Sequence, residues 1–211
     1  MAALHESALD AALLQLTRGG VVAVATESYF GLLADIGNPV AVDALFALKP
    51  RGADKGVPIV LPEAGRWRSL VAAPIPRLAQ AFADAFWPGG LSIALPAAAT
   101  VSSRVALDGS LAVRLPGPSP AAELTRRFAR PLSATSANLP GAPPAVHSAA
   151  VAASFADAIA QGVLFVIDGE SPGGAPSTVV RVSEAEYAVA RIGAVAVSAL
   201  DEIAKTHASR A

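Results

Sequence analysis

The hydrophobic positions of this chain follow two alternating patterns. Leucines recur at helical spacing between residues 9 and 16, and Gly19-Gly20 follows them, so we predict a helix that ends before the glycines. Ser7, with a carboxylate three residues later, is typical of the residue that caps such a helix. The run 21–25 is short and rich in valine, which is typical of a buried strand.

The same alternation continues along most of the chain. Further helices are expected at 38–48, 76–86, 120–129 and 148–161, and from 198 onwards. Further strands are expected at 57–61, 91–95, 111–115, 132–135, 163–167, 178–182 and 188–192. Alternating helices and strands with a strand-rich end indicate an α/β fold with a mixed sheet. The segment 140–144 is rich in Pro and Gly, but too little follows it for a second core, so we expect one domain over 1–211.

The amino-acid composition excludes several classes of function. The net charge is -1, which excludes a broadly basic nucleic-acid-binding surface. There is no cysteine, hence no disulfide, thiolate nucleophile or cysteine metal site. Acidic residues interrupt the N-terminus and no uncharged apolar stretch reaches membrane-spanning length, so we expect a cytoplasmic protein without a membrane segment.

Familiar catalytic signatures are missing from the sequence. It contains no Walker A sequence, no dinucleotide-binding glycine pattern, no H-E-x-x-H and no G-x-S-x-G. The three histidines lie far apart in the chain, so no metal site made of protein ligands is expected. What remains is a set of polar segments, each at the end of a predicted strand, where ligands of open α/β sheets gather.

One of these segments carries a cluster of cations. Lys49, Arg51 and Lys55 include two of the three lysines of the chain, and Pro and Gly keep the segment from forming a regular helix. Cations fixed on such a loop suit a polyphosphate, because they neutralise clustered negative charge. The alternative is a solvated loop without a ligand.

Hydroxyls and arginines follow other strands. Thr26 begins the polar segment 26–31, which suits either a small polar ligand or a local turn. Arg114 stands in an apolar strand and must meet an anion, either a structural carboxylate or that of a ligand. The segment 133–138 offers hydroxyls, an amide and backbone N–H groups to an anion, or forms an ordinary polar turn. Ser177 and Arg191 occupy comparable positions further on.

Taken in order, these segments resemble the YrdC/Sua5 family of threonylcarbamoyl-AMP synthases. The shared pattern is Thr-Glu-x-x-x-Gly-Leu, Lys-x-Arg, Trp-Pro-Gly, Val-Arg-x-Pro, Ser-Ala-Asn, Ser-Thr-Val and Arg-x-Gly, and it extends over about residues 20–193. The resemblance, closest to the short bacterial form, implies a YrdC-like twisted mixed sheet flanked by helices around a positively lined cavity.

The resemblance also implies an activity and its partners. The family joins L-threonine, bicarbonate or CO2 and ATP, releases pyrophosphate, and supplies the N6-threonylcarbamoyl group for adenosine 37 of ANN-decoding tRNAs. We therefore expect Mg2+ carried by the ATP phosphates, transfer of the product to a tRNA threonylcarbamoyltransferase complex, and contact with tRNA. Residues carried over by motif hold the phosphates (Lys49, Arg51 and Lys55, the first two as catalytic residues), the nucleotide (Ser110, Ser136, Asn138 and Arg191) and threonine (Thr26, Arg114 and Ser177).

Two motifs depart from the family pattern. Ala25 and Phe30 stand where the family commonly has Pro and Tyr, and the proline of Lys-x-Arg-Pro has moved between the cations. Two alternatives therefore stay open. One is a YrdC-like nucleotide- or RNA-binding protein without synthase activity, and the other is a carbamoyl-adenylate enzyme that accepts carbamoyl phosphate.

Overall fold

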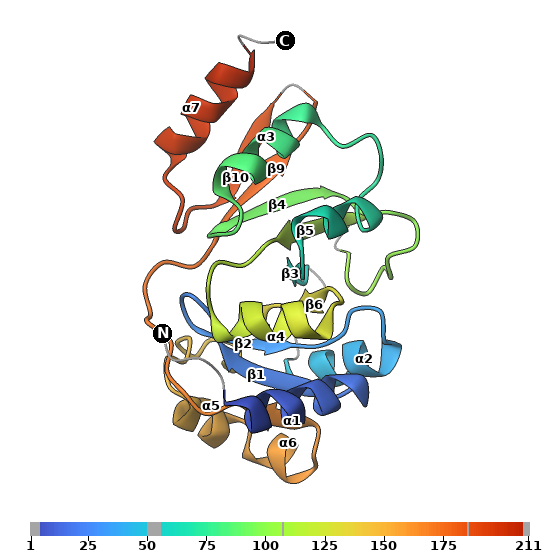
Figure 1. Ribbon diagram of the computed structural model, residues 1–211, viewed down its shortest axis with the longest axis vertical. Coiled ribbons are helices and arrows are strands. Elements are labelled where there is room, and N and C mark those ends of the chain that lie inside the picture. The colour runs from blue at the N-terminus through green and yellow to red at the C-terminus, as the bar shows by residue number, and fades with distance from the viewer. Residues whose placement is uncertain (1–4, 50–55, 107, 185, 209–211) are drawn as a thin grey trace.

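The computed structural model describes residues 5–49, 56–106, 108–184 and 186–208, and its strands lie in two sheets with helices on their outer faces (Figure 1). The helices are α1 Glu6–Thr17, α2 Pro39–Leu48, α3 Arg77–Phe86, α4 Pro120–Phe128, α5 Ser148–Ser154, α6 Ala156–Ala160 and α7 Val197–Ala208, with a 3-10 helix, η1, at Ala64–Ser69. The strands are β1 Val21–Ala25, β2 Phe30–Leu33, β3 Ile59–Val60, β4 Leu91–Pro96, β5 Ser110–Arg114, β6 Leu132–Ser133, β7 Thr135–Ser136, β8 Leu164–Val166, β9 Thr178–Val182 and β10 Tyr187–Arg191.

Both sheets are mixed. The smaller has the order β7-β2-β1-β8 and the larger β10-β9-β4-β5-β3-β6. The parallel pairs are β1 with β8, β3 with β5 and β4 with β9, whereas the other neighbours run antiparallel. The predicted α/β class is thus confirmed, with its strands divided over two sheets.

The two sheets meet at Ser133. Its backbone N–H donates to Ala34 O (2.9 Å), and its hydroxyl accepts from Ala34 N (2.9 Å). After Ser133 the chain crosses from the larger sheet to the smaller one, which breaks the predicted strand 132–135 into β6 and β7. The polar residues at this crossing are therefore close to both sheets.

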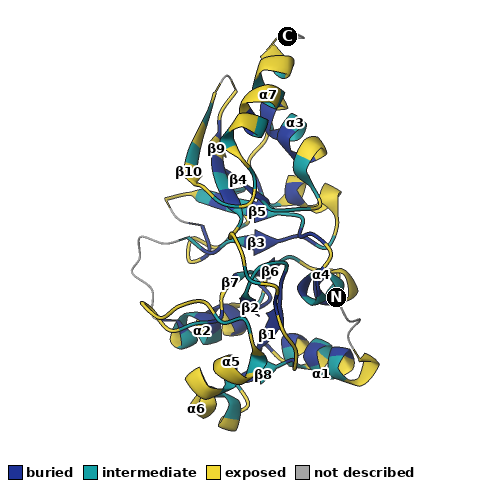
Figure 2. Cartoon of the chain, turned by 90° about the vertical axis from the view of Figure 1, so that its left-hand side faces the viewer, coloured by how far each residue is buried: buried dark blue, intermediate teal, exposed yellow. Residues whose placement is uncertain are grey.

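The core is made mainly of small aliphatic residues. Strand β1 is buried along its whole length, as expected for a strand with neighbours on both sides. Figure 2 shows buried residues concentrated in the strands at the middle of the molecule and exposed residues along α6 and α7. Aromatic rings add local anchors: Trp67 packs edge-on against Trp87, and Phe82 of α3 packs against Tyr187 of β10, with 5.1 Å between ring centroids in each pair.

Most predicted helices and strands are confirmed, and several boundaries are corrected. Asn38 caps α2 by accepting from Val40 N (3.0 Å), as the Asn-Pro start predicts. Ser7 does not cap α1, because that helix already begins at Glu6. The predicted helix 148–161 is interrupted at Phe155. Strand β2 and helix η1 were not predicted.

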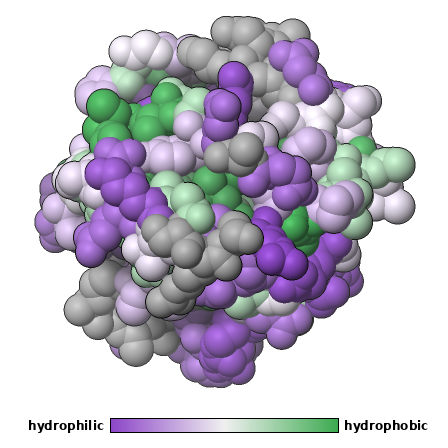
Figure 3. Space-filling model, turned by 90° about the horizontal axis from the view of Figure 1, so that it is seen from above, coloured by the Kyte–Doolittle hydropathy of each residue, from purple (hydrophilic) through white to green (hydrophobic). Residues whose placement is uncertain are grey.

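Seen from the end that carries α3 and α7, the surface is largely hydrophilic, with apolar side chains in small separate patches (Figure 3). No helix in the described part of the chain is long and apolar enough to cross a membrane.

Candidate functional site

A cavity of about 340 Å3 lies where the two sheets meet. Strands β2 and β7 contribute to its wall from the smaller sheet, and β3, β4 and β5 from the larger. Its polar lining residues are Thr26, Ser28, Tyr29, Ser92, Arg114, Thr135, Ser136, Asn138, Ser177 and Arg191. Six of the ten residues expected from the sequence are therefore together in one cavity.

Arg114 enters this cavity from the end of β5 and forms an ion pair with Glu27. NH1 of Arg114 donates to Glu27 Oε1 and lies 3.4 Å from Gly89 O. Of the two anions that the sequence allowed for this arginine, the structural carboxylate is therefore present. Burial, and then the positive charge of Arg191, lower the pKa of Arg114 to about 10. The group stays charged at neutral pH in spite of a second cation facing the same space.

A β-bulge in β10 directs Arg191 toward the cavity. Val189 pairs with Val180, but Arg191 pairs with Val179, so Ala190 is an extra residue in the strand. In a regular ladder Arg191 would instead oppose Thr178, which is fully buried on the other face. Bulges commonly re-aim a side chain near functional sites. By accommodating Ala190, the bulge thus keeps the Arg191 guanidinium on the cavity side of the strand.

Hydrogen bonds hold the Arg191 guanidinium against Ser177. Arg191 donates from Nε (3.0 Å) and NH2 (2.8 Å) to Ser177 O, and from NH2 to Ser177 Oγ (2.9 Å). The hydroxyl of Ser92 donates in turn to Ser177 Oγ (3.0 Å). Burial lowers the pKa of Arg191 from its ordinary value. Ser92 was missed from the sequence, since a single hydroxyl within an apolar strand gives little signal.

Gly193 explains the spacing of the Arg-x-Gly motif. A Cβ at Gly193 would lie 2.1 Å from Pro176 O and 2.6 Å from Ser177 C. The segment after β10 therefore lies directly against the backbone of Pro176 and Ser177, and Ala194 N donates to Pro176 O (2.8 Å). A glycine is required here for close approach, and this approach brings Arg191 within reach of Ser177.

Lys49 is the cap residue after the last turn of α2, and its side chain joins the helix to the segment that follows the crossing between the sheets. Its ammonium donates to the backbone O of Ser136, to Ser136 Oγ (2.9 Å) and to Asn138 Oδ1 (3.0 Å). The lysine is buried, and both of its partners line the cavity. The other two cations of the predicted loop, Arg51 and Lys55, lie outside the described residues.

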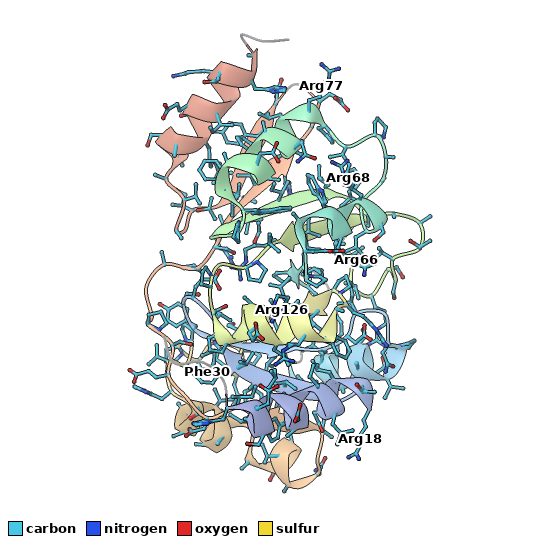
Figure 4. All side chains as sticks on the ribbon, viewed as in Figure 1. Arg18, Phe30, Arg66, Arg68, Arg77 and Arg126 are labelled. Carbon is cyan, nitrogen blue, oxygen red and sulfur yellow. The ribbon has the colours of Figure 1, made fainter. Side chains whose placement is uncertain are left out.

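Thr26 forms the local turn that the sequence allowed as one of two outcomes. Its hydroxyl donates to Tyr29 O (2.7 Å) and accepts from Ser28 N (3.1 Å) and Tyr29 N (3.3 Å). The turn leads into β2, whose first residue, Phe30, is labelled in Figure 4. Because Thr26 also lines the cavity, it shapes the wall through this turn.

A second hollow of about 540 Å3 adjoins the first and shares Pro58 and Arg191 with it. Ser110 lies here and not in the first cavity. The floor of this second hollow is built of small residues from neighbouring strands, including Ala94 of β4 and Ala112 of β5. Ser110 and Arg114 are about 13 Å apart along β5, at about 3.3 Å per residue. The two hollows together form an extended site with Arg191 between them.

The charged side chains that line the first cavity, among the described residues, are the guanidinium groups of Arg114 and Arg191. In contrast to Arg114 and Arg191, arginines such as Arg18 and Arg77 extend outward at the periphery (Figure 4). Among the described residues, no group of three or more acidic or histidine side chains is placed to hold a metal ion. The chemistry of the walls therefore suits an anionic ligand.

Comparison with known proteins agrees with this architecture. A family model named for Sua5, YciO and YrdC, with the description "Telomere recombination", matches residues 15–193. The chain belongs to this family. Within the Sua5/YciO/YrdC family, a protein of Xanthomonas campestris named threonylcarbamoyl-AMP synthase is 38% identical over 181 residues, covering 84% of this chain and 94% of the relative. A Pyrococcus abyssi protein of the same name is 32% identical over 192 residues, covering 89% of this chain and 54% of the relative.

Solved family structures share the fold. Pyrococcus abyssi Sua5 complexed with L-threonine superimposes with a TM-score of 0.83 at 28% identity, covering 92% of this chain and 56% of that one. This chain thus spans about half the length of the Pyrococcus protein. Escherichia coli YciO has a TM-score of 0.76 at 18% identity, covering 92% of each chain, which shows the common fold alone.

Proposed function

We propose that this protein is a threonylcarbamoyl-AMP synthase, which makes the adenylate from L-threonine, bicarbonate or CO2 and ATP. The observation that carries this proposal is the pair of guanidinium groups, Arg114 and Arg191, on one hydroxyl-lined cavity that continues into a second hollow. Such an arrangement suits two anions held side by side, as a bimolecular reaction between an amino acid and a nucleotide requires.

Threonine would occupy the first cavity. Arg114 would bind its carboxylate, because a planar guanidinium matches a carboxylate in geometry and charge. Thr26 and Ser177 lie on the same wall and would contact the remaining polar groups of the amino acid. The crystal structure of a 28% identical Sua5 with L-threonine supports an amino-acid site in this fold.

ATP would extend from the first cavity into the second. Lys49, Arg51 and Lys55 would hold the phosphates, with Ser136 and Asn138 beside them. Lys49 already contacts both Ser136 and Asn138, which supports this grouping. In the second hollow, Ser110 would contact the nucleoside, and the small-residue floor offers a flat surface for it. Arg191, which lines both hollows, would lie near the α-phosphate.

The chemistry needs no protein nucleophile. The threonine amine, once deprotonated, adds to CO2 to give a carbamate and a proton. A carbamate oxygen then attacks the α-phosphorus, the bond to the β-phosphate oxygen breaks, and pyrophosphate leaves. The contribution of the protein is to align the two anions and to stabilise the negative charge on the phosphates, with Lys49 and Arg51 in the catalytic role. Walls that exclude water protect both the carbamate and the adenylate from hydrolysis.

Mg2+ would bind mainly through the phosphates. It prefers six oxygen ligands and commonly takes several of them from substrate phosphates and water. In the cavity, Ser136 Oγ and Asn138 Oδ1 already accept from the Lys49 ammonium, so the phosphates and water would supply the oxygen ligands of the ion. When bound, the ion would neutralise part of the charge on the leaving pyrophosphate.

The product would then pass to tRNA modification. Threonylcarbamoyl-AMP is a labile mixed anhydride, so direct transfer to a tRNA threonylcarbamoyltransferase complex would limit its loss to water. In this proposal residues 1–211 act as a single unit, and any contact with tRNA is made in that complex.

Pyrophosphate release tests the proposal directly. The purified protein with ATP and bicarbonate should release pyrophosphate only when L-threonine is present, and mass spectrometry should detect threonylcarbamoyl-AMP. If ATP binds but the addition of threonine causes no pyrophosphate release, the protein is a nucleotide-binding protein without synthase activity and the present proposal is wrong. Release that requires carbamoyl phosphate instead would indicate the other carbamoyl-adenylate chemistry.

A further inference from the structure

Glu27 lies directly behind the cavity wall and joins the two sheets. It follows β1 of the smaller sheet, and its Oε1 accepts from NH1 of Arg114, at the end of β5 in the larger sheet. The backbone N–H of Gly117 lies 3.3 Å from the same oxygen. Arg114 lines the cavity, whereas Glu27 does not. Glu27 therefore reaches the ligand space only through the arginine.

The backbone around Glu27 is held in a fixed turn. Thr26, the residue before it, accepts the N–H groups of Ser28 and Tyr29 on its hydroxyl and donates to Tyr29 O. Thr26 N also donates to Tyr29 O (3.1 Å), which closes the turn a second time. With both neighbours fixed, the Glu27 side chain has a defined starting point and direction toward β5.

The ion pair uses one side of the guanidinium. The hydrogen bonds that Arg114 makes to described residues all start from NH1, where Glu27 and Gly89 O are the acceptors. A guanidinium carries five donors in a rigid planar fork, so fixing one side also fixes the direction of the other. A bidentate contact to a ligand carboxylate needs such a fixed edge.

The Glu27 carboxylate also acts against the repulsion between two like charges. The positive charge of Arg191 disfavours the charged form of Arg114 and lowers its pKa, in addition to the effect of burial. The Glu27 carboxylate, in contact with Arg114, offsets this repulsion. Without this carboxylate, repulsion from Arg191 would favour a conformation of Arg114 that points away from the cavity.

We propose that Glu27 is a positioning residue for the amino-acid substrate: it holds NH1 of Arg114 so that the free edge of the guanidinium meets the substrate carboxylate. This inference rests on the proposed function, in which Arg114 binds that carboxylate. It assigns the Thr-Glu pair two separate tasks, with Thr26 fixing the turn and Glu27 aiming the arginine.

The test compares Glu27→Ala and Glu27→Gln with wild type by calorimetric binding of L-threonine and, separately, of ATP. Glu27→Ala should raise the threonine Kd about tenfold or more, the equivalent of one charge-assisted hydrogen bond, and leave the ATP Kd nearly unchanged. Glu27→Gln keeps an acceptor for NH1 and should recover much of the lost threonine affinity. Glu63→Gln is the matched control and should behave as wild type, because Glu63 is exposed and directly precedes the 3-10 helix η1.

Two results would overturn the positioning role. One is a Glu27→Ala variant that binds threonine as tightly as wild type. The other is a parallel loss of threonine and ATP affinity in both Glu27 variants together with a lower Tm, which would mean a purely structural ion pair. Because binding is measured without turnover, absent threonine-dependent pyrophosphate release would count against the proposed function alone. A wild-type protein that does not bind threonine would refute both.

Discussion

The close approach at Gly193 allows a sharp test of how the site is built. In a Gly193→Ala variant the new methyl group would lie 2.1 Å from Pro176 O, whereas ordinary Cβ contacts are 3.4–4 Å. The segment after β10 and the backbone of Pro176 and Ser177 would have to separate by about 1 Å, since neither is a flexible side-chain end. The bonds from Arg191 to Ser177 would lengthen with them.

We expect the Gly193→Ala variant to lose both stability and catalytic rate. Overpacking of this kind lowers the free energy of unfolding by about 1–3 kcal/mol, and a loss of 2 kcal/mol lowers the Tm of a chain of this size by about 4–8 °C. A shift of about 1 Å in a group that positions a reactant costs up to about a hundredfold in rate. We therefore expect kcat/KM for threonine-dependent pyrophosphate release to fall about ten- to a hundredfold, beyond what the lower stability explains at 25 °C.

Thermal unfolding and steady-state kinetics are the assays, and Gly65→Ala is the matched control. A Cβ at Gly65 meets nothing within 4 Å, so this second glycine-to-alanine change should leave Tm and activity close to those of wild type. If Gly193→Ala keeps the wild-type Tm and kinetics, the close approach does not exist in solution and our account of how Arg191 is held is wrong.

Three further changes test other parts of the molecule. Arg114→Lys keeps a charge beside Glu27 but loses the planar guanidinium, so the threonine KM should rise about tenfold while the ATP KM stays similar. A threonine KM equal to that of wild type would remove Arg114 from the threonine site. Lys49→Ala should weaken calorimetric ATP binding about ten- to a hundredfold, and unchanged ATP binding would refute its phosphate role. Burial and the hydrogen bond to Asp201 raise the pKa of Tyr187 from 10.0 to about 12, so its contribution to stability is complete below pH 10 and is lost as the pH rises toward 12. Tyr187→Phe should flatten that alkaline decline in urea unfolding, and an unchanged decline would contradict the assignment.

Local sequence signals predicted much of the fold. The Asn-Pro start of α2 and the bounds of β1 and β9 need only nearby residues, because capping chemistry, proline geometry and β-branched runs act over a few positions. Strand β2 was missed because its four residues follow the polar turn at Thr26 and show no alternation, as all four are buried. Its strand character comes from pairing with β1 and β7, which nearby residues do not specify.

The candidate site shows the same division. Arg114 was identifiable because a cation in an apolar strand demands an anion, but the choice of Glu27, 87 positions away, depends on how the two sheets meet. Ser136 and Asn138 were identifiable as a polar turn, and their contact with Lys49 is again a long-range result. Ser110 was expected to contact the nucleotide, and its place in the second hollow, about 13 Å from Arg114 along β5, again depends on how the strands are arranged.

The extra residue in β10 indicates two places where this hairpin can change in length. Residues added or lost at its tip, beyond Tyr187 and Val182, leave the pairing of the ladder intact. Loss of Ala190 would remove the bulge and leave the arginine opposite Val179, as it is now, so the arginine would stay on the same face of the strand. In related chains, single-residue gaps should therefore occur both at the hairpin tip and at the position of Ala190, with the arginine retained.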